Sequence, residues 1–382
     1  MNRDVYVLGV GMSRFGGPPQ TLAQKMITSG RAALADAGLG YDRVESLYLG
    51  SALMPPTFGV DVVKDFGLTG IPVVRIENAS ATGAAAFFEA VHAVAGGRVE
   101  VSMALGFDDP KAVGVGFNNR SAESRGLLGA VGPMTFFSMW AVRRMAERGT
   151  TIETLAKIAA KNWNNARHNP FAERQAPEPV TVEQVLASRM LAYPHTARMA
   201  APQGGGAAAA IVVSGDVVRS LGVSDAVRVV AAQAVSERYD PGHLFKGAIV
   251  GPPEMARRGA HAAYEEAGIG PDELNVIAFH DAYAIEELLY YEEIGLCGPG
   301  EGDRLVHDGT TELTGKHPVS TDGGFIGRGH PAGPTGLAQI WELTEQLRGR
   351  AGGRQVADPR HGLAHIIGAG SVCYTHILEA AR

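Results

Sequence analysis

Ser80 stands in a sequence context that would suit a nucleophile. Residues 76–84 read Ile-Glu-Asn-Ala-Ser-Ala-Thr-Gly-Ala, which predicts a strand ending before the serine and a small-residue helix beginning after it. The free N–H groups and the positive dipole end of such a helix stabilise negative charge developing beside them. The position suits a nucleophile or an oxyanion hole, although serine is also a frequent N-cap, and this segment alone favours that structural role.

His280 stands at a second predicted junction of this kind. Residues 279–283 read Phe-His-Asp-Ala-Tyr, and they end one predicted strand and begin another helix. Asp281 and Tyr283 are candidates for accessory roles beside the imidazole. Taken alone, the segment is more typical of a capped helix with a structural histidine.

His330 lies in the most distinctive segment of the chain. Residues 323–336 read GGFIGRGHPAGPTG and precede an apolar helix predicted over 337–347. Glycines and prolines around a histidine hold the imidazole rigidly and let a substrate approach the backbone closely. The pattern therefore favours a functional imidazole over an ordinary turn.

Gly368 and Gly370 belong to a weaker fourth signal. Residues 366–371 read Ile-Ile-Gly-Ala-Gly-Ser, which predicts a strand followed by a glycine turn whose N–H groups could face a ligand. By itself this segment is more typical of an ordinary turn.

The elements that must position these residues alternate between strand and helix in the first part of the chain. Strands are predicted over 5–10, 44–49, 73–77 and 101–105, and helices over 22–37 and 81–95. Such alternation is typical of an α/β fold. Residues 111–200 carry little strand signal and include helical patterns over 141–148 and 152–166, so they predict a mostly helical insertion before a strand over 207–213.

An internal repeat relates two distant parts of the chain. Residues 32–52 and 262–282 align without a gap at an offset of 230, and both read as a helix, a glycine-capped turn and a strand. The recurring residues are Ala32, Ala33, Ala37, Gly38, Gly40, Asp42 and Ala52, which return as Ala262, Ala263, Ala267, Gly268, Gly270, Asp272 and Ala282. The repeat predicts two similar α/β halves, residues 1–228 with the insertion at about 111–200, and residues 229–382.

Composition narrows the classes of partner and compartment. The chain has 382 residues, 45% of them hydrophobic and 19% charged, and a net charge of −6, which disfavours nucleic acid and anionic membranes as partners. It has only two cysteines, Cys297 and Cys373, and neither a signal-peptide pattern nor an apolar run long enough to span a membrane. We therefore expect a cytoplasmic protein. No metal-ligand spacing stands out among the 12 histidines.

Together these segments resemble the thiolase superfamily, and most closely the sterol carrier protein-type thiolases. The 323–336 segment fits the specific signature GGxxxxGHPxGxTG, and residues 280–283 are similar to the His-Asp-Cys-Phe motif of that subgroup. Residues 169–172, 204–206 and 295–302 also lie where the family has similar residues. The resemblance covers almost the whole chain in the expected order.

The resemblance implies both a fold and a reaction. The fold would be a five-layered αβαβα arrangement of two duplicated βαβαβαββ halves, with a helical loop domain inserted in the first half. Members are usually homodimers that act on coenzyme A thioesters in lipid metabolism, and coenzyme A is then a substrate rather than a resident cofactor. Many relatives also pair with a small protein that bears a zinc ribbon and an oligonucleotide-binding-type barrel.

The resemblance also assigns roles to single residues. Ser80 takes the position of the nucleophilic cysteine, His330 would activate it, and His280 would hold the thioester oxygen of the second substrate. Backbone N–H groups of Ser80 and of the glycine turn at Gly368 and Gly370 would form a second oxyanion hole.

Several positions depart from the family pattern. Ser80 replaces the reactive cysteine, and Ser320 stands where an asparagine is usual. The second cysteine, which moves the proton at the α-carbon, would lie at Ala282 in the sterol carrier type or at Ile366 in other thiolases. Cys297 and Cys373 match neither place, so we predict that both are structural.

These departures change the expected chemistry. A hydroxyl is not ionised near neutral pH, so Ser80 needs a positioned base, for which His330 is the candidate. The resulting oxyester is less reactive than a thioester, which favours one-way acyl transfer or Claisen-type condensation over reversible thiolysis. The carbanion could come from decarboxylation of a malonyl-type thioester, on coenzyme A or a carrier protein, or from a proton transfer to Tyr283 or water.

Two other functions fit the same residues. A thiolase-like retro-aldolase would cleave a coenzyme A thioester together with a small partner, but the retention of His330 argues against it. A non-catalytic thioester-binding or scaffold subunit would fit the absence of both cysteines. The sequence also leaves open that Ser80 is an engineered replacement of a native cysteine. The insertion also holds cations near which coenzyme A phosphates would bind in the family, none of which the sequence singles out: Arg120, Arg125, Arg143, Arg144, Lys157, Lys161 and Arg167.

Overall fold

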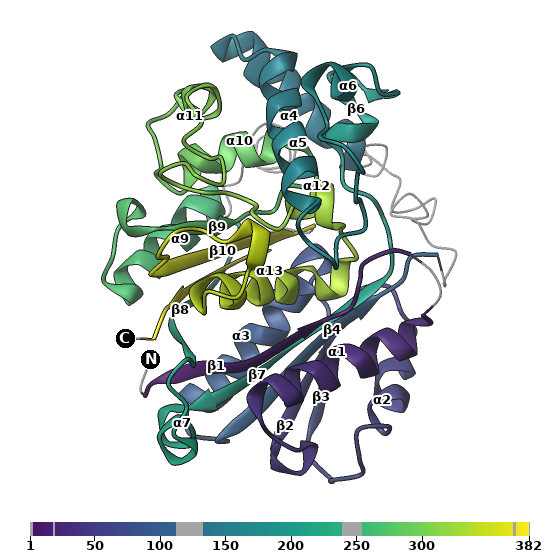
Figure 1. Ribbon diagram of the computed structural model, residues 1–382, viewed down its shortest axis with the longest axis vertical. Coiled ribbons are helices and arrows are strands. Elements are labelled where there is room, and N and C mark those ends of the chain that lie inside the picture. The colour runs from purple at the N-terminus through teal and green to yellow at the C-terminus, as the bar shows by residue number, and fades with distance from the viewer. Residues whose placement is uncertain (1–2, 18–19, 112–132, 239–253, 370–371, 382) are drawn as a thin grey trace.

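The computed structural model describes residues 3–17, 20–111, 133–238, 254–369 and 372–381 (Figure 1). The strands of its main sheet are β1 (Val5–Met12), β2 (Ser46–Gly50), β3 (Val73–Ile76), β4 (Val101–Asp108), β7 (Gly206–Ser214), β8 (Val227–Ser236), β9 (Val276–Ala278), β10 (His361–Gly368) and β11 (Val372–Glu379). The helices are α1 (Leu22–Ala37), α2 (Phe58–Val63), α3 (Thr82–Ala95), α4 (Pro133–Arg148), α5 (Ile152–Ala166), α6 (Val182–Leu186), α7 (Gly215–Leu221), α9 (Glu254–Ala267), α10 (Ala284–Glu293), α11 (Gly302–His307), α12 (Gly324–Arg328) and α13 (Ala332–Leu347).

The main sheet consists of two halves with the same internal pattern. Its order is β3-β2-β4-β7-β1-β8-β11-β10-β9, and the halves meet where β1 pairs briefly with β8. In the first half β2 is parallel to β3 and β4, and β4, β7 and β1 then pair antiparallel. In the second half β9 is parallel to β10 and to an isolated bridge at Val319, and β10, β11 and β8 then pair antiparallel. The predicted duplication of the fold is therefore confirmed.

The repeated sequence segments fold alike. Helix α1 ends at Gly38 with φ of 64°, and α9 ends at Gly268 with φ of 70°. Each left-handed glycine is followed by one short 3-10 turn and then by β2 or β9. Glycine adopts this cap conformation without strain, so the repeated glycine in the sequence marked a repeated helix end.

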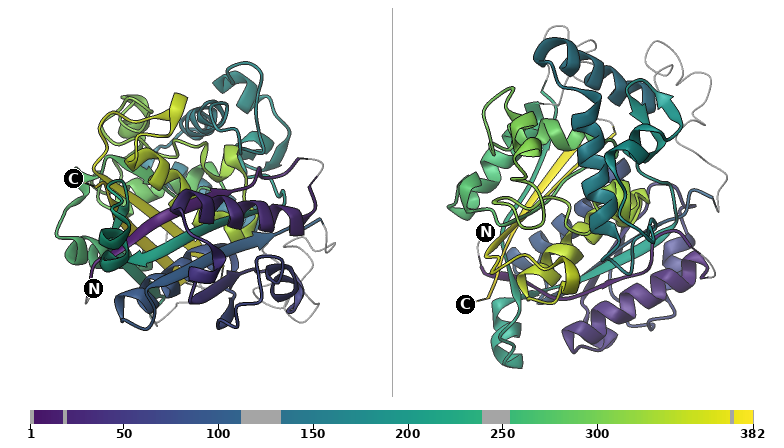
Figure 2. Two further views of the ribbon diagram at one scale, coloured as in Figure 1. Left: turned by 60° about the horizontal axis from the view of Figure 1, so that its bottom comes forward. Right: turned by 45° about the horizontal axis from the view of Figure 1, so that its top comes forward.

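Helices α3 and α13 form the central layer between the two halves (Figures 1 and 2). Helix α1 covers the outer face of the first half, and α9 covers that of the second. A Cβ atom on Gly83 would overlap the Gly333 carbonyl oxygen, and one on Gly336 would overlap the backbone of Ala84. Gly83 and Gly336 are thus required for close packing of α3 against α13, which brings the N-terminal ends of both helices together.

The start of α13 differs from the sequence prediction. The helix begins at Ala332, directly after His330 and Pro331, instead of at residue 337. Gly333 and Pro334 suggested a loop, but proline is tolerated in the first turn of a helix because its missing N–H would be unpaired there. His330 is therefore fixed immediately before a helix N-terminus, as Ser80 is.

The predicted insertion is mostly helical over its described part, with α4, α5 and α6. It also contains a short hairpin of β5 (Met190–Ala192) and β6 (His195–Thr196), which the sequence did not predict. Inside the protein, Lys161 of α5 donates to the Glu287 carboxylate of α10, so a buried ion pair joins the insertion to the second half. The predicted boundary at residue 228 falls within β8, and this division stays a prediction.

Across the described ranges, no helix has both the length and the apolar character needed to cross a bilayer. The same residues contain no group of three or more histidine, cysteine, aspartate or glutamate side chains placed to hold a metal ion.

Candidate active site

Ser80 lies in a sharp turn between β3 and α3. The turn spans Ala79–Ala81, and Ala79 has φ of 48°, a left-handed conformation that is uncommon outside glycine. The N-cap of α3 is Ala81, which makes no side-chain capping bond. The hydroxyl of Ser80 instead lies 3.0 Å from Nε2 of His330, so the turn presents Ser80 to the start of α13.

Thr335 determines the tautomer of His330. The Thr335 hydroxyl donates its hydrogen to the Pro331 carbonyl oxygen, so toward Nδ1 of His330, 3.1 Å away, it can only accept. Nδ1 therefore carries the ring hydrogen, and Nε2 directs a lone pair at the Ser80 hydroxyl. This is the arrangement of a general base beside a hydroxyl.

His280 lies next to His330. Its ring lies 5.5 Å from that of His330 between centroids and is nearly perpendicular to it. Phe325 stacks on His330 at 4.5 Å and meets the edge of His280 at 4.9 Å, so it holds the two imidazoles in fixed orientations. The structure thus brings together Ser80, His280 and His330, all of them buried.

Both imidazoles are neutral in this environment. Burial lowers the pKa of His280 to about 3. Burial, followed by the nearby His280 and Arg328, holds the pKa of His330 well below its usual value. Neither ring carries a positive charge near neutral pH, so each has one nitrogen that accepts and one that donates.

Gly368 lies against the Ser80 turn. A Cβ atom at this position would overlap the carbonyl oxygen of Asn78, two residues before the serine. The end of β10 therefore approaches the turn as closely as only glycine allows. Gly370 lies outside the described residues.

Ala282 and Ile366 meet beside Ser80. Both belong to one small apolar cluster that also contains Ala81, Ala84 and Phe325. The two positions at which the resemblance would place a second cysteine therefore converge in space, and neither carries a thiol. Cys297 and Cys373 lie outside this cluster, and burial raises the pKa of each thiol to about 12, as expected for unreactive cysteines.

Asp281 and Tyr283 make contacts of their own near the site, and Tyr283 packs against the apolar cluster beside Ser80. Oδ1 of Asp281 accepts from the Phe325 N–H at 2.7 Å, and Oδ2 accepts from the Asn162 amide at 2.8 Å, so this carboxylate holds the glycine loop in place. The ring of Tyr283 lies 5.1 Å from Phe137 and 5.2 Å from His195. Burial raises the pKa of Tyr283 to about 12, so its phenol is protonated and a poor base.

Five of the seven candidate cations of the insertion have partners among the described residues. Arg144 is buried between Glu292 and Asp303, each 2.8 Å away, and Lys161 is buried against Glu287. Neither is free to bind a phosphate. Lys157 contacts His307, Arg143 pairs with Glu147, and Arg167 donates to backbone carbonyls, whereas Arg120 and Arg125 lie outside the described residues.

Sequence reasoning did not single out Thr335, Phe325, Glu286 or Asp108. Thr335 and Phe325 belong to the 323–336 signature, and Glu286 follows His280 by six positions. Asp108 ends β4, and its Oδ2 accepts from the Gly333 N–H at 2.6 Å, which fixes the first turn of α13. An acidic residue at the end of a strand was the only signal for Asp108.

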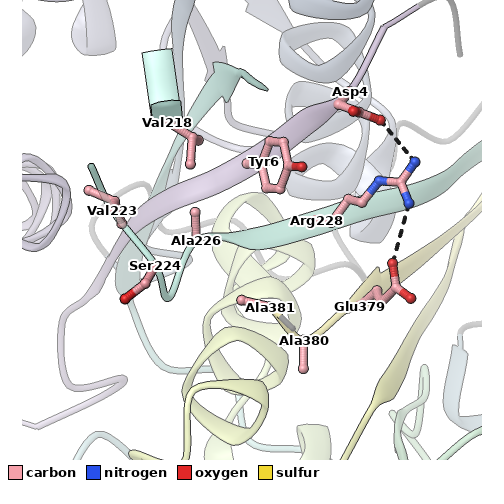
Figure 3. Close-up of a pocket in the computed structure, with 10 residues that line it drawn as sticks. All are labelled: Asp4, Tyr6, Val218, Val223, Ser224, Ala226, Arg228, Glu379, Ala380 and Ala381. Carbon is pink, nitrogen blue, oxygen red and sulfur yellow. Dashed lines mark hydrogen bonds and ion pairs between the residues drawn. The ribbon is translucent and has the colours of Figure 1, made fainter. Parts of the chain in front are cut away.

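A surface cleft of about 530 Å³ lies elsewhere, between the ends of β1, β8 and β11 (Figure 3). In this cleft Arg228 pairs with Asp4 at 2.8 Å and with Glu379 at 3.4 Å. None of Ser80, His280 and His330 lines it. Arg228 is paired with carboxylates on both sides, so this cleft offers no unpaired cation of that residue to a ligand.

Comparison with known proteins gives consistent matches. Residues 249–380 match the family described as Thiolase C-terminal domain-like. The chain is 36% identical to benzoylsuccinyl-CoA thiolase subunit BbsB of Thauera aromatica, over 97% of this chain and 96% of that protein. It is 34% identical to sterol carrier protein 2 of Gallus gallus, over 97% of this chain and 70% of that protein. The solved Ltp2-ChsH2(DUF35) aldolase has a similar fold, with a TM-score of 0.85 at 24% identity over 99% of this chain and 98% of that chain.

Proposed function

The chain belongs to the thiolase family, and we propose that it transfers acyl groups from coenzyme A thioesters through Ser80. Within this family its motifs most closely resemble those of the sterol carrier protein type. The observation that supports this proposal most directly is the 3.0 Å contact between the Ser80 hydroxyl and Nε2 of His330. A hydroxyl beside the lone pair of a fixed imidazole can be deprotonated as it attacks.

The acylation step proceeds as follows. Oγ of Ser80 attacks the thioester carbonyl carbon, and its proton passes to Nε2 of His330. The oxyanion is held by the N–H groups of Ser80 and Gly368. The carbon–sulfur bond then breaks, and the coenzyme A sulfur leaves with the proton from His330, so that the acyl group remains on Ser80 as an ester.

The acceptor step differs from that of a thiolase with two cysteines. An acceptor with a hydroxyl or thiol returns its proton to Ser80 through His330. A carbon acceptor needs another base or the loss of carbon dioxide, because Ala282 and Ile366 carry no ionisable group; His280 would hold the enolate oxygen. The named substrate of the Thauera relative leads us to include aromatic and dicarboxylic acyl groups among the thioesters to test.

A panel of acyl-CoA thioesters tests this function directly. Intact mass spectrometry is expected to show the protein gaining the mass of one acyl group, with one free coenzyme A thiol released per chain. Proteolysis should place the added mass on the peptide that contains Ser80. Release of coenzyme A without any adduct, at every time resolved by rapid quenching, would contradict a covalent route.

Thr335→Val is expected to slow this acylation by about tenfold to a hundredfold, by analogy with the outer partners that orient metal-bound imidazoles. The change removes the acceptor of the Nδ1 hydrogen, so the ring loses its fixed tautomer. Thr344→Val is the matched control, because Thr344 of the same helix is also buried and donates to the carbonyl four residues earlier, at 2.8 Å from Ile340. Equal rates for both variants in stopped-flow coenzyme A release would contradict the orienting role.

A retro-aldolase is the second candidate, favoured by the lack of a thiol at Ala282 and Ile366. Here His330 would take the proton of a β-hydroxyl, the carbon–carbon bond would break to a carbonyl product, and the enolate oxygen of the remaining thioester would bind at His280 until the α-carbon takes the proton from His330. The solved aldolase of similar fold has a DUF35 partner, and this candidate would need a small partner of that type. It predicts release of an aldehyde or ketone that does not require Ser80.

A further inference from the structure

His280 is held from behind by the carboxyl group of Glu286. Nδ1 of His280 lies 2.6 Å from Oε1 of Glu286, and both side chains are buried. Glu286 belongs to the first turn of α10, and its Oε2 accepts from the Tyr283 N–H at 3.0 Å. The Tyr283 N–H therefore occupies Oε2, and Oε1 is the oxygen that faces the imidazole of His280.

Among the residues that the structure describes, none supplies this pair with a compensating positive charge. Among the described residues, Glu286 has no ion-pair partner other than His280. In the described part of the chain, the titratable groups whose pKa values respond to the pair are Tyr283 and Tyr290 near Glu286, and His330 and His365 near His280. Burial lowers the pKa of His365 to about 3 and raises that of Tyr290, so both are neutral. An ionised Glu286 would be a buried charge without a cation, which is strongly unfavourable.

The protonation state of Glu286 determines which ring nitrogen of His280 carries the hydrogen. Burial raises the pKa of Glu286 well above its usual value, which favours the neutral acid. With Oε2 accepting a backbone N–H, the acid donates its hydrogen from Oε1 to Nδ1, so the ring hydrogen must lie on Nε2. If the proton moves across to Nδ1, Nε2 still carries its hydrogen, because the pair as a whole keeps the same charge.

We propose that Glu286 is a positioning residue that retains a proton and thereby makes Nε2 of His280 a hydrogen-bond donor to the thioester oxygen. The two neighbouring imidazoles then have opposite tautomers. Thr335 leaves Nε2 of His330 as an acceptor for the Ser80 hydroxyl, whereas Glu286 leaves Nε2 of His280 as a donor. The role of the donor rests on the proposed function, but the tautomer itself does not.

The first test is nitrogen-15 NMR of histidine-labelled protein at neutral pH, with the His280 signals identified by their absence in His280→Asn. Glu286→Gln is the informative variant, because glutamine has the shape of the neutral acid and can donate to Nδ1 while accepting from Tyr283. We expect Nε2–H in the wild type and in Glu286→Gln alike. The Nδ1–H tautomer in the wild type would overturn the proposal without any reference to activity.

The second test compares rates of product formation from thioesters. The kcat of Glu286→Gln should stay within about threefold of the wild type. The kcat of Glu286→Leu should fall at least about tenfold, because the imidazole that donates to the oxyanion loses its fixed orientation. If glutamine and leucine lower kcat equally, with unchanged melting temperatures, an ionised carboxylate is required and the proposal is wrong. If Nε2–H is found but neither variant alters the rate, the tautomer assignment stands and the oxyanion role of His280 in the proposed function fails.

Discussion

Ser80→Ala is expected to eliminate the acyl adduct and to lower turnover of the acyl-transfer reaction at least about a thousandfold, as removal of a nucleophile does in comparable enzymes. The hydroxyl is the atom that would form the ester, and no thiol lies in the apolar cluster beside it. Intact mass spectrometry after incubation with acyl-CoA measures the adduct, and release of coenzyme A measures turnover. Ser80→Cys should retain an adduct, now as a thioester that free coenzyme A can reverse.

Ser138→Ala provides a closely matched control. Ser138 is a buried serine whose hydroxyl lies 3.0 Å from a histidine nitrogen, Nδ1 of His195, in the insertion. The change removes a serine–histidine contact of the same length that involves none of Ser80, His280 and His330, so acylation should persist. Turnover that survives Ser80→Ala would disprove the covalent mechanism, and release of a ketone or aldehyde by this variant would establish the aldolase alternative.

His330→Ala is expected to slow acylation of Ser80 by about 10²–10⁴-fold, the usual contribution of a positioned general base. The effect should be large because a serine hydroxyl is not ionised near neutral pH. Nδ1 of His330 donates to the Thr335 hydroxyl instead of a carboxylate, so the imidazolium formed during attack lacks the stabilisation that a catalytic triad provides. Rapid-quench mass spectrometry gives the acylation rate.

The pH profile of the same reaction tests the environment of His330. Burial, His280 and Arg328 hold the pKa of His330 below its usual value, so the unprotonated base persists at lower pH. The wild-type rate should stay constant as pH falls through 6.5 and should decline only below that value, and the decline should vanish in His330→Ala. His376→Ala removes another buried imidazole and should preserve both rate and profile. A decline centred at or above pH 6.5 would contradict the assigned environment.

The sequence alone determined many of the elements of the two halves and the family. Helix caps and strand patterns depend on neighbours along the chain, so helices such as Leu22–Ala37 were predicted to the residue. The repeat at an offset of 230 is visible in the sequence itself. The glycines of the 323–336 segment were recognisable because close contacts exclude a Cβ atom there, with α3 at Gly336 and with Ala166 at Gly323. Pro334 misled the prediction of the α13 start, since a proline reads alike in a loop and in a first helical turn.

The tertiary structure alone decided how the candidate residues act together. Ser80 and His330 are 250 positions apart, and their 3.0 Å contact exists only because the two central helices pack backbone to backbone. The opposite tautomers of the two histidines depend on Thr335 and Glu286, and the loss of Arg144 and Lys161 as phosphate ligands depends on their burial. Hydrogen bonds, burial and pKa values are set by the groups that surround a side chain in space, and local sequence does not specify those groups.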